Sequence, residues 1–339
     1  MVIAMETKPV KLGLVGLHFG NMVVLELLKP EHKKFIEIAA LCDRDEPLAK
    51  HLSEEHGISK HYTSIDALLS DPEIEAVGLF TGPDSRAKLI DQILDAGRDV
   101  LTTKPFERSA EEARRILQKA RSLGRVIHLN CPTPTPPKDI WQIDQWITQY
   151  SLGRPIGYRA MTWCSYREKA DGSWYDDPVR CPAAPIFRLG IYLVNDISRY
   201  FGEVEDLQVY ESRIFTGRPT SDNAQLALIH KNGAVGSIFA SFCVKDHRSY
   251  LHALEMNFEN GTIFRNCGPD AVDGKIRLGL TANAPDGSFV REQREFEASV
   301  GDYQYEQFYK AVRGEALHNP TPDDQIIHGI QILQKMQES

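Results

Sequence analysis

A short apolar stretch that ends in a glycine turn constrains this chain more than any other part of its sequence. Val10–Val15 reads as a buried β-strand, Gly16 follows at once, and an apolar helix is predicted to begin near Asn21. In such a strand–turn–helix arrangement, backbone N–H groups at the helix N-terminus can hold a pyrophosphate. A G-x-G-x-x-G reading places Gly16, His18 and Asn21 in the three glycine slots. A reading one residue shorter makes Gly20 the last glycine, so the turn predicts a dinucleotide site with an altered middle position.

The first part of the chain alternates strand and helix patterns, which predicts a doubly wound parallel sheet with crossover helices. The predicted strands are short and rich in aliphatic residues, as strands buried on both faces tend to be. They are Val10–Val15, Ile36–Cys42, Ala76–Phe80, Asp99–Thr102 and Val126–Asn130. The helices predicted between them are Asn21–Leu28, Pro47–His56, 85–96 and Ala110–Leu123.

The pattern changes after a proline-rich run, Cys131–Lys138, which can continue neither a helix nor a sheet. With 339 residues the chain exceeds a usual single core, so we expect a Rossmann domain at 1–131 and a second domain at 132–339. The second part contains helix patterns at 139–150, 187–200, 303–313 and 322–336. Strands joined by short polar turns fill 207–295, which predicts an α+β domain with a large, mainly antiparallel open sheet. The terminal helix is expected either to stay there or to pack back on the first domain.

Composition excludes several classes of protein. A net charge of −8 argues against a nucleic-acid binder, which normally carries a basic footprint. No apolar run approaches the roughly 20 residues that span a bilayer, and the N-terminus lacks a signal-peptide pattern. The six cysteines show neither C-x-x-C nor metal-ligand spacing. We therefore expect a cytoplasmic protein without a metal site, a membrane partner or a nucleic-acid partner.

The cofactor residues expected around the turn are Gly16, His18, Phe19, Gly20 and Asn21. The second strand ends at Asp43, followed by Arg44. A carboxylate about 20 residues beyond the glycine turn can bind the ribose hydroxyls of NAD. Arg44 complicates the choice of cofactor, because a guanidinium at this position can pair with the 2′-phosphate of NADP. NAD and NADP both remain open.

Two further loops follow strands at the carboxyl edge of the sheet, where ligands of open α/β folds bind. Thr81 and Pro83 belong to the first loop and are expected to contact the cofactor, as are Lys104 and Pro105 in the second. A lysine here can hydrogen-bond a substrate oxygen and stabilise its alkoxide character during hydride loss. Pro105 allows a cis peptide bond that would direct the lysine inward. Lys104 is accordingly a catalytic candidate.

The helix predicted at 187–200 places Arg188, Tyr192 and Asn195 on one face by their i, i+4, i+7 spacing. Tyr192 is a candidate proton donor beside a cation such as Lys104. Arg188 either binds an anionic substrate or pairs with one of the acidic residues Asp176, Asp177 and Asp196. Asn195 and Trp174, the latter in an aromatic loop at 166–185, are the other expected substrate-binding residues.

The ordered set of these motifs resembles the family of glucose–fructose oxidoreductase and inositol dehydrogenase over essentially the whole chain. It comprises the glycine turn, Asp43, Thr81-Gly-Pro-Asp84, Lys104-Pro105, the helix around Gly190 and Thr321-Pro-Asp-Asp324. The resemblance implies a Rossmann domain, a C-terminal sheet whose outer face builds homodimers or homotetramers, and NAD(P)-dependent chemistry at a carbinol carbon of a sugar or cyclitol.

The chain departs from the family pattern at several positions. Thr103 replaces the acidic neighbour of the lysine, and Arg188 with Tyr192 stands where Asp and His often lie four residues apart. Arg86 stands where a histidine often follows the Thr-x-Pro-Asn loop, and with Arg188 it suggests an anionic substrate such as a sugar acid. We expect an oxidoreductase in which Lys104 polarises the reacting oxygen and Tyr192 moves the proton. The alternative is a member that binds NAD(P) as a ligand sensor or regulatory partner.

Overall fold

A computed structural model describes residues 8–84, 86–298 and 301–338, and the chain folds into two compact units. The first unit contains the chain up to Glu107, then Glu111–Thr135, and finally Asp302–Pro320. The second contains Arg108–Ala110, Pro136–Gly301 and the chain from Thr321 onward. The return of Asp302–Pro320 to the first unit was not expected from a single boundary at residue 131. It follows from packing, because Tyr305, Phe308 and Tyr309 join the hydrophobic core of that unit.

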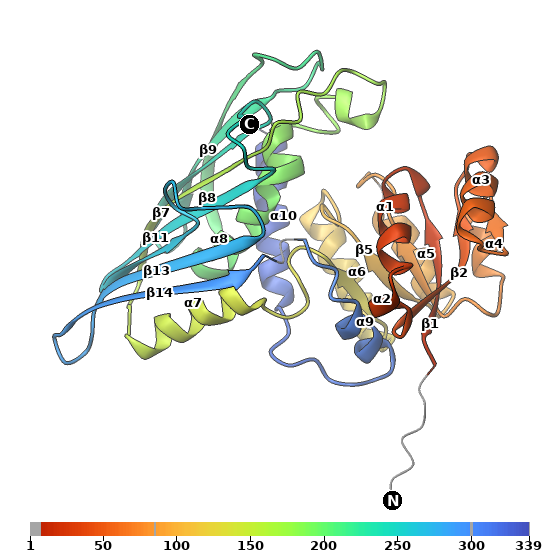
Figure 1. Cartoon of the computed structure of the whole chain (residues 1–339), viewed down its shortest axis with the longest axis horizontal. Coiled ribbons are helices and arrows are strands. Elements are labelled where there is room, and N and C mark those ends of the chain that lie inside the picture. Colours follow the sequence, from red (N-terminus) through yellow and green to blue (C-terminus); the bar gives the residue numbers. More distant parts are fainter. Residues whose placement is uncertain (1–7, 85, 299–300, 339) are drawn as a thin grey trace, which may run out of the picture. The chain divides into compact units, whose positions relative to one another are not determined.

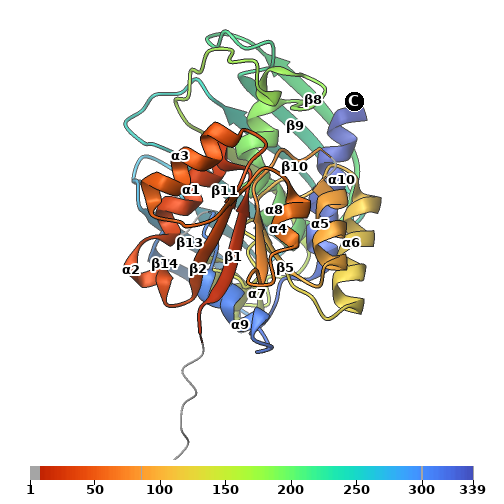
Figure 2. The same ribbon diagram turned by 90° about the vertical axis from the view of Figure 1, so that its right-hand side faces the viewer.

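The first unit is built on a six-stranded parallel sheet in the order β3-β2-β1-β4-β5-β6. Helices α1 and α3 lie on one side of this sheet, and α5 and α6 lie on the other (Figure 2). This doubly wound arrangement confirms the predicted Rossmann class. Its elements are β1 Val10–Val15, α1 Leu17–Leu27, α2 Pro30–Lys33, β2 Ile36–Cys42, α3 Glu46–His56, β3 His61–Tyr62, α4 Ile65–Leu69, β4 Ala76–Leu79, α5 Arg86–Asp95, β5 Asp99–Thr102, α6 Ala110–Ser122, β6 Ile127–Leu129 and α9 Tyr305–Val312.

The second unit is built on an eight-stranded sheet in the order β14-β13-β12-β11-β7-β10-β9-β8. Only the β7–β10 pair is parallel, so the mainly antiparallel open sheet is confirmed. Helices α7, α8 and α10 cover one face of the sheet (Figure 1). Its elements are α7 Lys138–Gln149, β7 Pro155–Trp163, a 3₁₀ turn Trp174–Asp176, a π-helical turn Ile186–Gly190, α8 Ile191–Phe201, β8 Val204–Ser212, β9 Asn223–His230, β10 Val235–Ser241, β11 Leu251–Phe258, β12 Gly261–Arg265, β13 Lys275–Asn283, β14 Phe289–Glu297 and α10 Asp323–Glu338.

A buried ion cluster ties two helices of the second unit to its sheet. The Arg265 guanidinium of β12 lies 2.7 Å from a carboxylate oxygen of Asp139 in α7 and 2.8 Å from one of Asp196 in α8. Burial alone would disfavour this guanidinium charge, and the two carboxylates compensate for it. Asp196 is therefore part of the core and is not the partner of Arg188.

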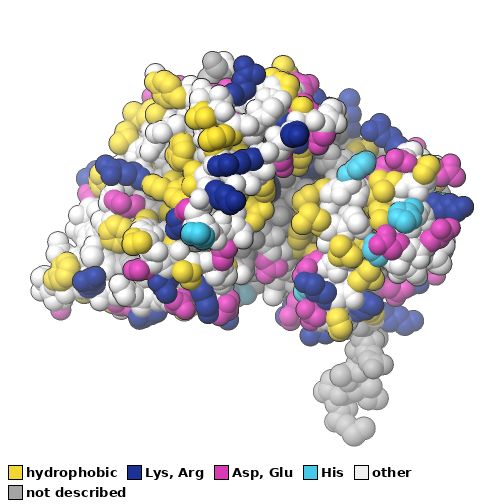
Figure 3. Space-filling view, turned by 45° about the horizontal axis from the view of Figure 1, so that its top comes forward, with side chains coloured by type: hydrophobic (Ala, Val, Ile, Leu, Met, Phe, Trp, Pro, Cys, Tyr) yellow, Lys and Arg dark blue, Asp and Glu magenta, His cyan; other side chains and the backbone are white. Residues whose placement is uncertain are grey.

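The surface carries charges of both signs. On the face seen in Figure 3, Lys and Arg side chains alternate with Asp and Glu, with apolar side chains between them. Among the helices in the described part of the chain, none is long and apolar enough to cross a membrane.

Candidate dinucleotide and substrate sites

The glycine turn follows β1 in a single residue. Gly16 adopts φ +89°, and a Cβ at this position would come within 2.9 Å of the backbone carbon of Phe80. The predicted helix start near Asn21 was therefore wrong: the helix α1 begins at Leu17, because Gly16 alone makes the turn. The N–H groups of the first turn point out of the helix end without intrahelical partners, which is the arrangement that holds a pyrophosphate.

Gly20 fulfils the role that the last glycine of such a motif has. A Cβ on Gly20 would lie 2.7 Å from Leu14 Cδ2, so glycine lets α1 pack this closely on β1 without a shift of the Leu14 side chain. His18 and Phe19 are exposed in the first turn of the helix, next to the expected pyrophosphate position. The side chain of Asn21 instead contacts His56 of α3, with 3.0 Å between Oδ1 and Nε2.

The carboxylate at the end of β2 reaches the start of α1. Asp43 Oδ2 accepts a hydrogen bond from the Leu17 N–H at 2.8 Å, and its Oδ1 accepts one from the Asp45 N–H at 3.1 Å. The carboxylate thus lies beside the helix N-terminus, where a ribose attached to a bound pyrophosphate is expected. Arg44 is exposed beside it. The glycine turn, the N–H groups of the first turn of α1 and the Asp43 carboxylate at this edge of the sheet therefore fit a dinucleotide.

Arg86 holds together the two loops at the carboxyl edge of β4 and β5. Its side chain is buried, and its guanidinium donates to the carbonyls of Thr81, Thr103 and Pro105. These bonds occupy it within the protein, which argues against the suggestion that Arg86 binds an anionic substrate. The residue before it, Ser85, which begins the predicted helix 85–96, lies outside the described residues; α5 spans Arg86–Asp95.

The Lys104 loop is shaped by polar contacts from β5 and the segment after β6. The Lys104–Pro105 peptide bond is cis, as the sequence allowed. Asn130 Oδ1 accepts hydrogen bonds from the Lys104 N–H at 3.1 Å and from the Thr103 hydroxyl at 3.2 Å. Thr103 therefore anchors the loop through its hydroxyl, at the position where the resemblance implied an acidic neighbour of the lysine. Lys104 is half-buried, and Pro83 of the neighbouring loop is buried.

In the second unit the expected single helix is two elements. Residues 186–190 form a π-helical turn, and α8 begins only at Ile191. The prediction of one regular helix over 187–200 was therefore wrong: Arg188 lies in the π turn, and Tyr192 and Asn195 lie in α8.

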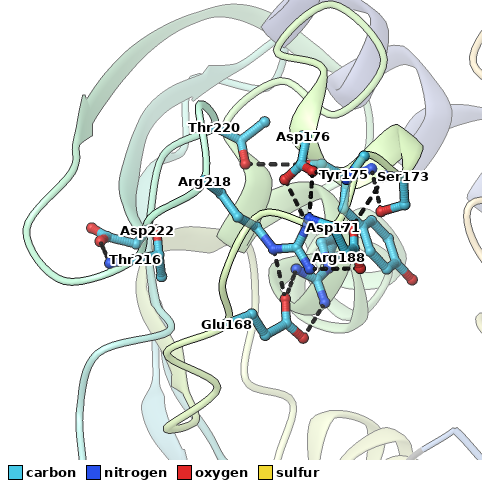
Figure 4. Close-up of polar contacts among 11 residues, drawn as sticks. Glu168, Asp171, Ser173, Tyr175, Asp176, Arg188, Thr216, Arg218, Thr220 and Asp222 are labelled. Atoms are coloured by element: carbon cyan, nitrogen blue, oxygen red, sulfur yellow. Dashed lines mark hydrogen bonds and ion pairs between the residues drawn. The ribbon is translucent and has the colours of Figure 1, made fainter.

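Arg188 belongs to a cluster of two arginines and three carboxylates (Figure 4). Its guanidinium makes a bidentate pair with Glu168, at 2.7 and 2.9 Å, and stacks 3.8 Å from the centroid of the Tyr175 ring. Arg218 contacts the same Glu168 carboxylate at 3.2 Å and also binds Asp171 and Asp176. The partner of Arg188 is thus Glu168 from the 166–185 loop, and none of the three acidic residues considered from the sequence.

Neighbouring contacts order the two loops of this cluster. Thr220 donates to the Tyr175 carbonyl at 2.9 Å. The buried Asp222 carboxylate accepts from the backbone N–H groups of residues 214–216, between 2.7 and 2.9 Å, and these bonds lower its pKa against the effect of burial.

Two expected substrate-binding residues have structural contacts. Asn195 is buried, donates to the Ile191 carbonyl at 3.0 Å, and lies against Gly329 of α10, where a Cβ would come within 2.5 Å of its Oδ1. Its expected role as a substrate ligand is corrected accordingly, since its amide lies in the α8–α10 contact. Trp174 is half-buried and packs against Tyr175 and Phe187, with ring centroids 4.3 and 6.2 Å apart.

Tyr192 lies in the first turn of α8 and is half-buried. Its ring contacts the His252 ring edge to face, with centroids 5.4 Å apart. Sequence reasoning missed His252, Glu168, Arg218 and Asn130. Their partners lie far along the chain, so no local spacing shows them. The sequence did indicate a structural role for Arg86, because a positive charge at a helix N-terminus is unfavourable unless the side chain has another partner.

The turn, the strand-ending carboxylate and the sheet order define the first unit as a dinucleotide-binding unit. The family described as "Oxidoreductase family, NAD-binding Rossmann fold" matches residues 10–131, and the GFO/IDH/MocA C-terminal domain matches residues 140–264. The chain belongs to the Gfo/Idh/MocA oxidoreductase family, and its first unit is the NAD-binding Rossmann fold of that family.

Among curated relatives, the chain is 26% identical to D-apiose dehydrogenase of Paraburkholderia graminis, over 67% of this chain and 60% of the relative. It is 28% identical to trans-1,2-dihydrobenzene-1,2-diol dehydrogenase of Oryctolagus cuniculus, over 68% of each. The match thus spans about three fifths of the length of the apiose dehydrogenases. In fold, this chain resembles an oxidoreductase from Agrobacterium radiobacter whose structure was solved in complex with NAD+, L-tartaric acid and magnesium. The TM-score is 0.67, and the identity is 18%, with 96% of this chain and 95% of that chain covered.

Proposed function

We propose that this protein is an NAD(P)-dependent dehydrogenase that transfers hydride between nicotinamide and a carbinol carbon of a neutral sugar or polyol. The observation that carries the proposal is the edge formed by the Gly16 turn and Asp43, with Lys104 on the same carboxyl edge of the sheet. Relatives named as dehydrogenases of apiose and of a dihydrodiol support it. When bound, the nicotinamide supplies or accepts the hydride.

The chain's own residues have separate roles in this proposal. First-turn N–H groups of α1 hold the pyrophosphate, and Asp43 accepts from the ribose hydroxyls. Lys104 donates to the substrate oxygen and, as a cation, stabilises its negative charge as the C–H bond breaks. Tyr192 takes up or returns the hydroxyl proton. We also propose NAD over NADP, because the Asp43 carboxylate repels a 2′-phosphate. Arg44, whose guanidinium could pair with that phosphate, lies exposed beside Asp43.

A neutral substrate is favoured over a sugar acid by the contacts of the two arginines. Arg86 is engaged by three carbonyls, and Arg188 by both oxygens of Glu168. In the cluster of Figure 4, the positive charges of Arg188 and Arg218 face the three carboxylates of Glu168, Asp171 and Asp176. A substrate carboxylate would therefore meet no uncompensated positive charge there.

A two-stage experiment tests the function. Native mass spectrometry and titrations with NADH and NADPH first establish cofactor binding. Stopped-flow absorbance at 340 nm against a panel of neutral and acidic sugars then measures turnover, with Lys104→Ala and Tyr192→Phe as variants. We expect NADH binding and turnover that both variants reduce. Cofactor binding without turnover on any panel member would favour the ligand sensor instead.

We further propose a cytoplasmic homodimer or homotetramer formed through the outer face of the large sheet. Exposed apolar side chains lie on adjacent strands of that face: Met161, Tyr210, Ile229 and Val235. Val235 and Ile229 are direct cross-strand neighbours, and exposed apolar side chains on one sheet face are candidates for a protein contact. Light scattering on wild type and Val235→Lys tests this, and a monomeric wild type would contradict it.

A further inference from the structure

A second titratable ring lies directly beside Tyr192. His252 is the core-facing residue near the start of β11, and it is paired across the strands with Thr162 of β7. His252 Nδ1 and Thr162 Oγ1 are hydrogen-bonded at 2.9 Å. His252 is 7% exposed and Thr162 is fully buried, so the imidazole is held in place. A hydroxyl can donate to or accept from Nδ1, and therefore suits both the neutral and the charged ring.

The contact between His252 and Tyr192 is geometrically defined. The two rings meet edge to face at 69°, which is a preferred arrangement of aromatic pairs. The phenol hydroxyl also lies close to Gly301, where a Cβ would come within 2.9 Å of the oxygen. The Tyr192 side chain thus contacts the His252 ring and lies close to the backbone at Gly301, whose φ of +75° favours glycine.

The groups that face His252 come from several elements. The Tyr250 ring stacks parallel to the His252 ring, with centroids 6.4 Å apart. The Tyr250 hydroxyl is hydrogen-bonded to the Tyr166 hydroxyl, and the Arg188 guanidinium lies 5.4 Å from the centroid of the Tyr166 ring. Trp163, the residue after Thr162, points to the other face of the sheet, where it packs with its cross-strand partner Leu251. The Arg248 guanidinium lies 5.3 Å from the centroid of the Trp163 ring and is paired with Asp246. The charge of Arg188, which lies over Tyr166, is neutralised by the carboxylate of Glu168.

We infer that His252, oriented by Thr162, is a positioning residue that fixes the Tyr192 ring and couples the protonation of its own imidazole to the Tyr192 phenol. This rests on the proposed function in assigning proton transfer to Tyr192. When the imidazole gains a proton, Nδ1 becomes a donor and Thr162 accepts, so the hydrogen bond survives. A positive ring beside a phenol favours release of the phenol proton. Proton transfer at Tyr192 then depends on pH through His252.

The test reads Tyr192 without any substrate. Tyrosine labelled with ¹³C at Cζ is introduced into the full chain, and the Tyr192 resonance is assigned by its loss in Tyr192→Phe. In wild type we expect this resonance to move through a step as the pH is lowered from about 8 and the imidazole gains its proton. The step is lost in His252→Phe. It shifts in Thr162→Val and is retained in Thr162→Ser, which keeps the hydroxyl.

A matched control is His230→Asn. His230 is another buried histidine of the same sheet, hydrogen-bonded to Tyr158 at 3.1 Å. We expect it to lower stability while leaving the Tyr192 step unchanged. A wild-type resonance without a step, or one whose pH course is the same in His252→Phe, overturns the inference.

Turnover provides the second readout once a substrate is identified. His252→Phe is expected to lower kcat by about tenfold or more, as small misplacements of a catalytic group do, with NADH affinity unchanged. Thr162→Ser is expected to keep the wild-type pH profile of kcat, whereas Thr162→Val is expected to change it. If the resonance step is present but no substrate is turned over, the coupling stands and the dehydrogenase proposal fails separately.

Discussion

Asp43 accepts a hydrogen bond from the Leu17 N–H, so the end of β2 is tied to the first residue of α1. We expect Asp43→Ala to raise the Kd for NADH at least about tenfold, which corresponds to roughly 1.4 kcal/mol, and to reduce discrimination against NADPH. The physical reason is the loss of the carboxylate that we propose accepts hydrogen bonds from the ribose hydroxyls. Fluorescence titration with both cofactors measures the change.

Asp45→Ala is the matched control for that variant. Asp45 caps α3 by accepting from the Leu48 N–H at 3.1 Å, and its loss costs about 1 kcal/mol of stability. We expect its NADH affinity to equal that of wild type. Equal weakening by both variants would show that Asp43 acts only through the fold.

His18 occupies the slot in which a glycine normally lets the backbone approach a pyrophosphate. We expect His18→Gly to lower the Kd for NADH several-fold, even though glycine in a helix costs about 1 kcal/mol of stability. Met22→Gly, at an exposed position of the same helix, carries the same helix penalty without a change in Kd. Weaker binding by His18→Gly would show that the imidazole itself contacts the cofactor. Isothermal titration distinguishes these results.

The sequence allowed the Rossmann sheet to be predicted because each buried strand has a strong apolar pattern next to a turn signal. Val10–Val15 and Ile36–Cys42 coincide with β1 and β2. The two-residue strand β3 and the short helices α2 and α4 are too brief to show a period. The start of α1 was misplaced because a single left-handed glycine replaced the longer turn that was assumed.

The candidate site was predictable only where its residues follow strands directly. The sequence placed Asp43 and Lys104 at the carboxyl edge of the parallel sheet in this way, and the structure has both residues there. The pairing of Arg188 with Glu168 joins a π turn to an irregular loop, and neither has a periodic sequence pattern. The contact of Tyr192 with His252 depends on strand register, which emerges only when β7 pairs with β11.

Arg86 connects the loops that carry Thr81 and Lys104. A lysine at this position has one ammonium group and cannot reach all three carbonyls, so we expect Arg86→Lys to lower the free energy of unfolding by about 2–4 kcal/mol. Turnover falls by the same factor on acidic and neutral sugars, because the arginine acts through loop geometry. Urea denaturation and the sugar panel measure both effects. Arg115→Lys, in an exposed ion pair on α6, is expected to change stability by less than about 0.5 kcal/mol.

The pair of Arg188 and Glu168 provides a test of substrate charge. A double-mutant cycle with Arg188→Met and Glu168→Gln is expected to give a coupling energy of about 1 kcal/mol or more, because the pair is bidentate and the Arg188 side chain is only 10% exposed. We expect the ratio of kcat/KM for acidic to neutral sugars to stay within about twofold of wild type in Arg188→Ala, as neutralised guanidinium groups attract anions weakly. A selective loss of activity on acidic sugars would restore Arg188 as an anion-binding residue.

His128 in β6 makes stability depend on pH. Its ring is buried, its Nε2 is hydrogen-bonded to the Tyr303 carbonyl at 2.7 Å, and burial lowers its pKa from 6.5 to about 4. Between these values the unfolded chain binds a proton that the folded chain does not, so stability falls as the pH drops. The loss is about 1.4 kcal/mol per pH unit and reaches roughly 3 kcal/mol near pH 4. We expect His128→Gln, which retains a donor for the Tyr303 carbonyl, to remove this part of the slope in urea denaturation between pH 7 and 5. His51→Gln, whose side chain is 72% exposed, is the control and should keep the wild-type slope. An unchanged slope in His128→Gln would show that other groups govern acid unfolding.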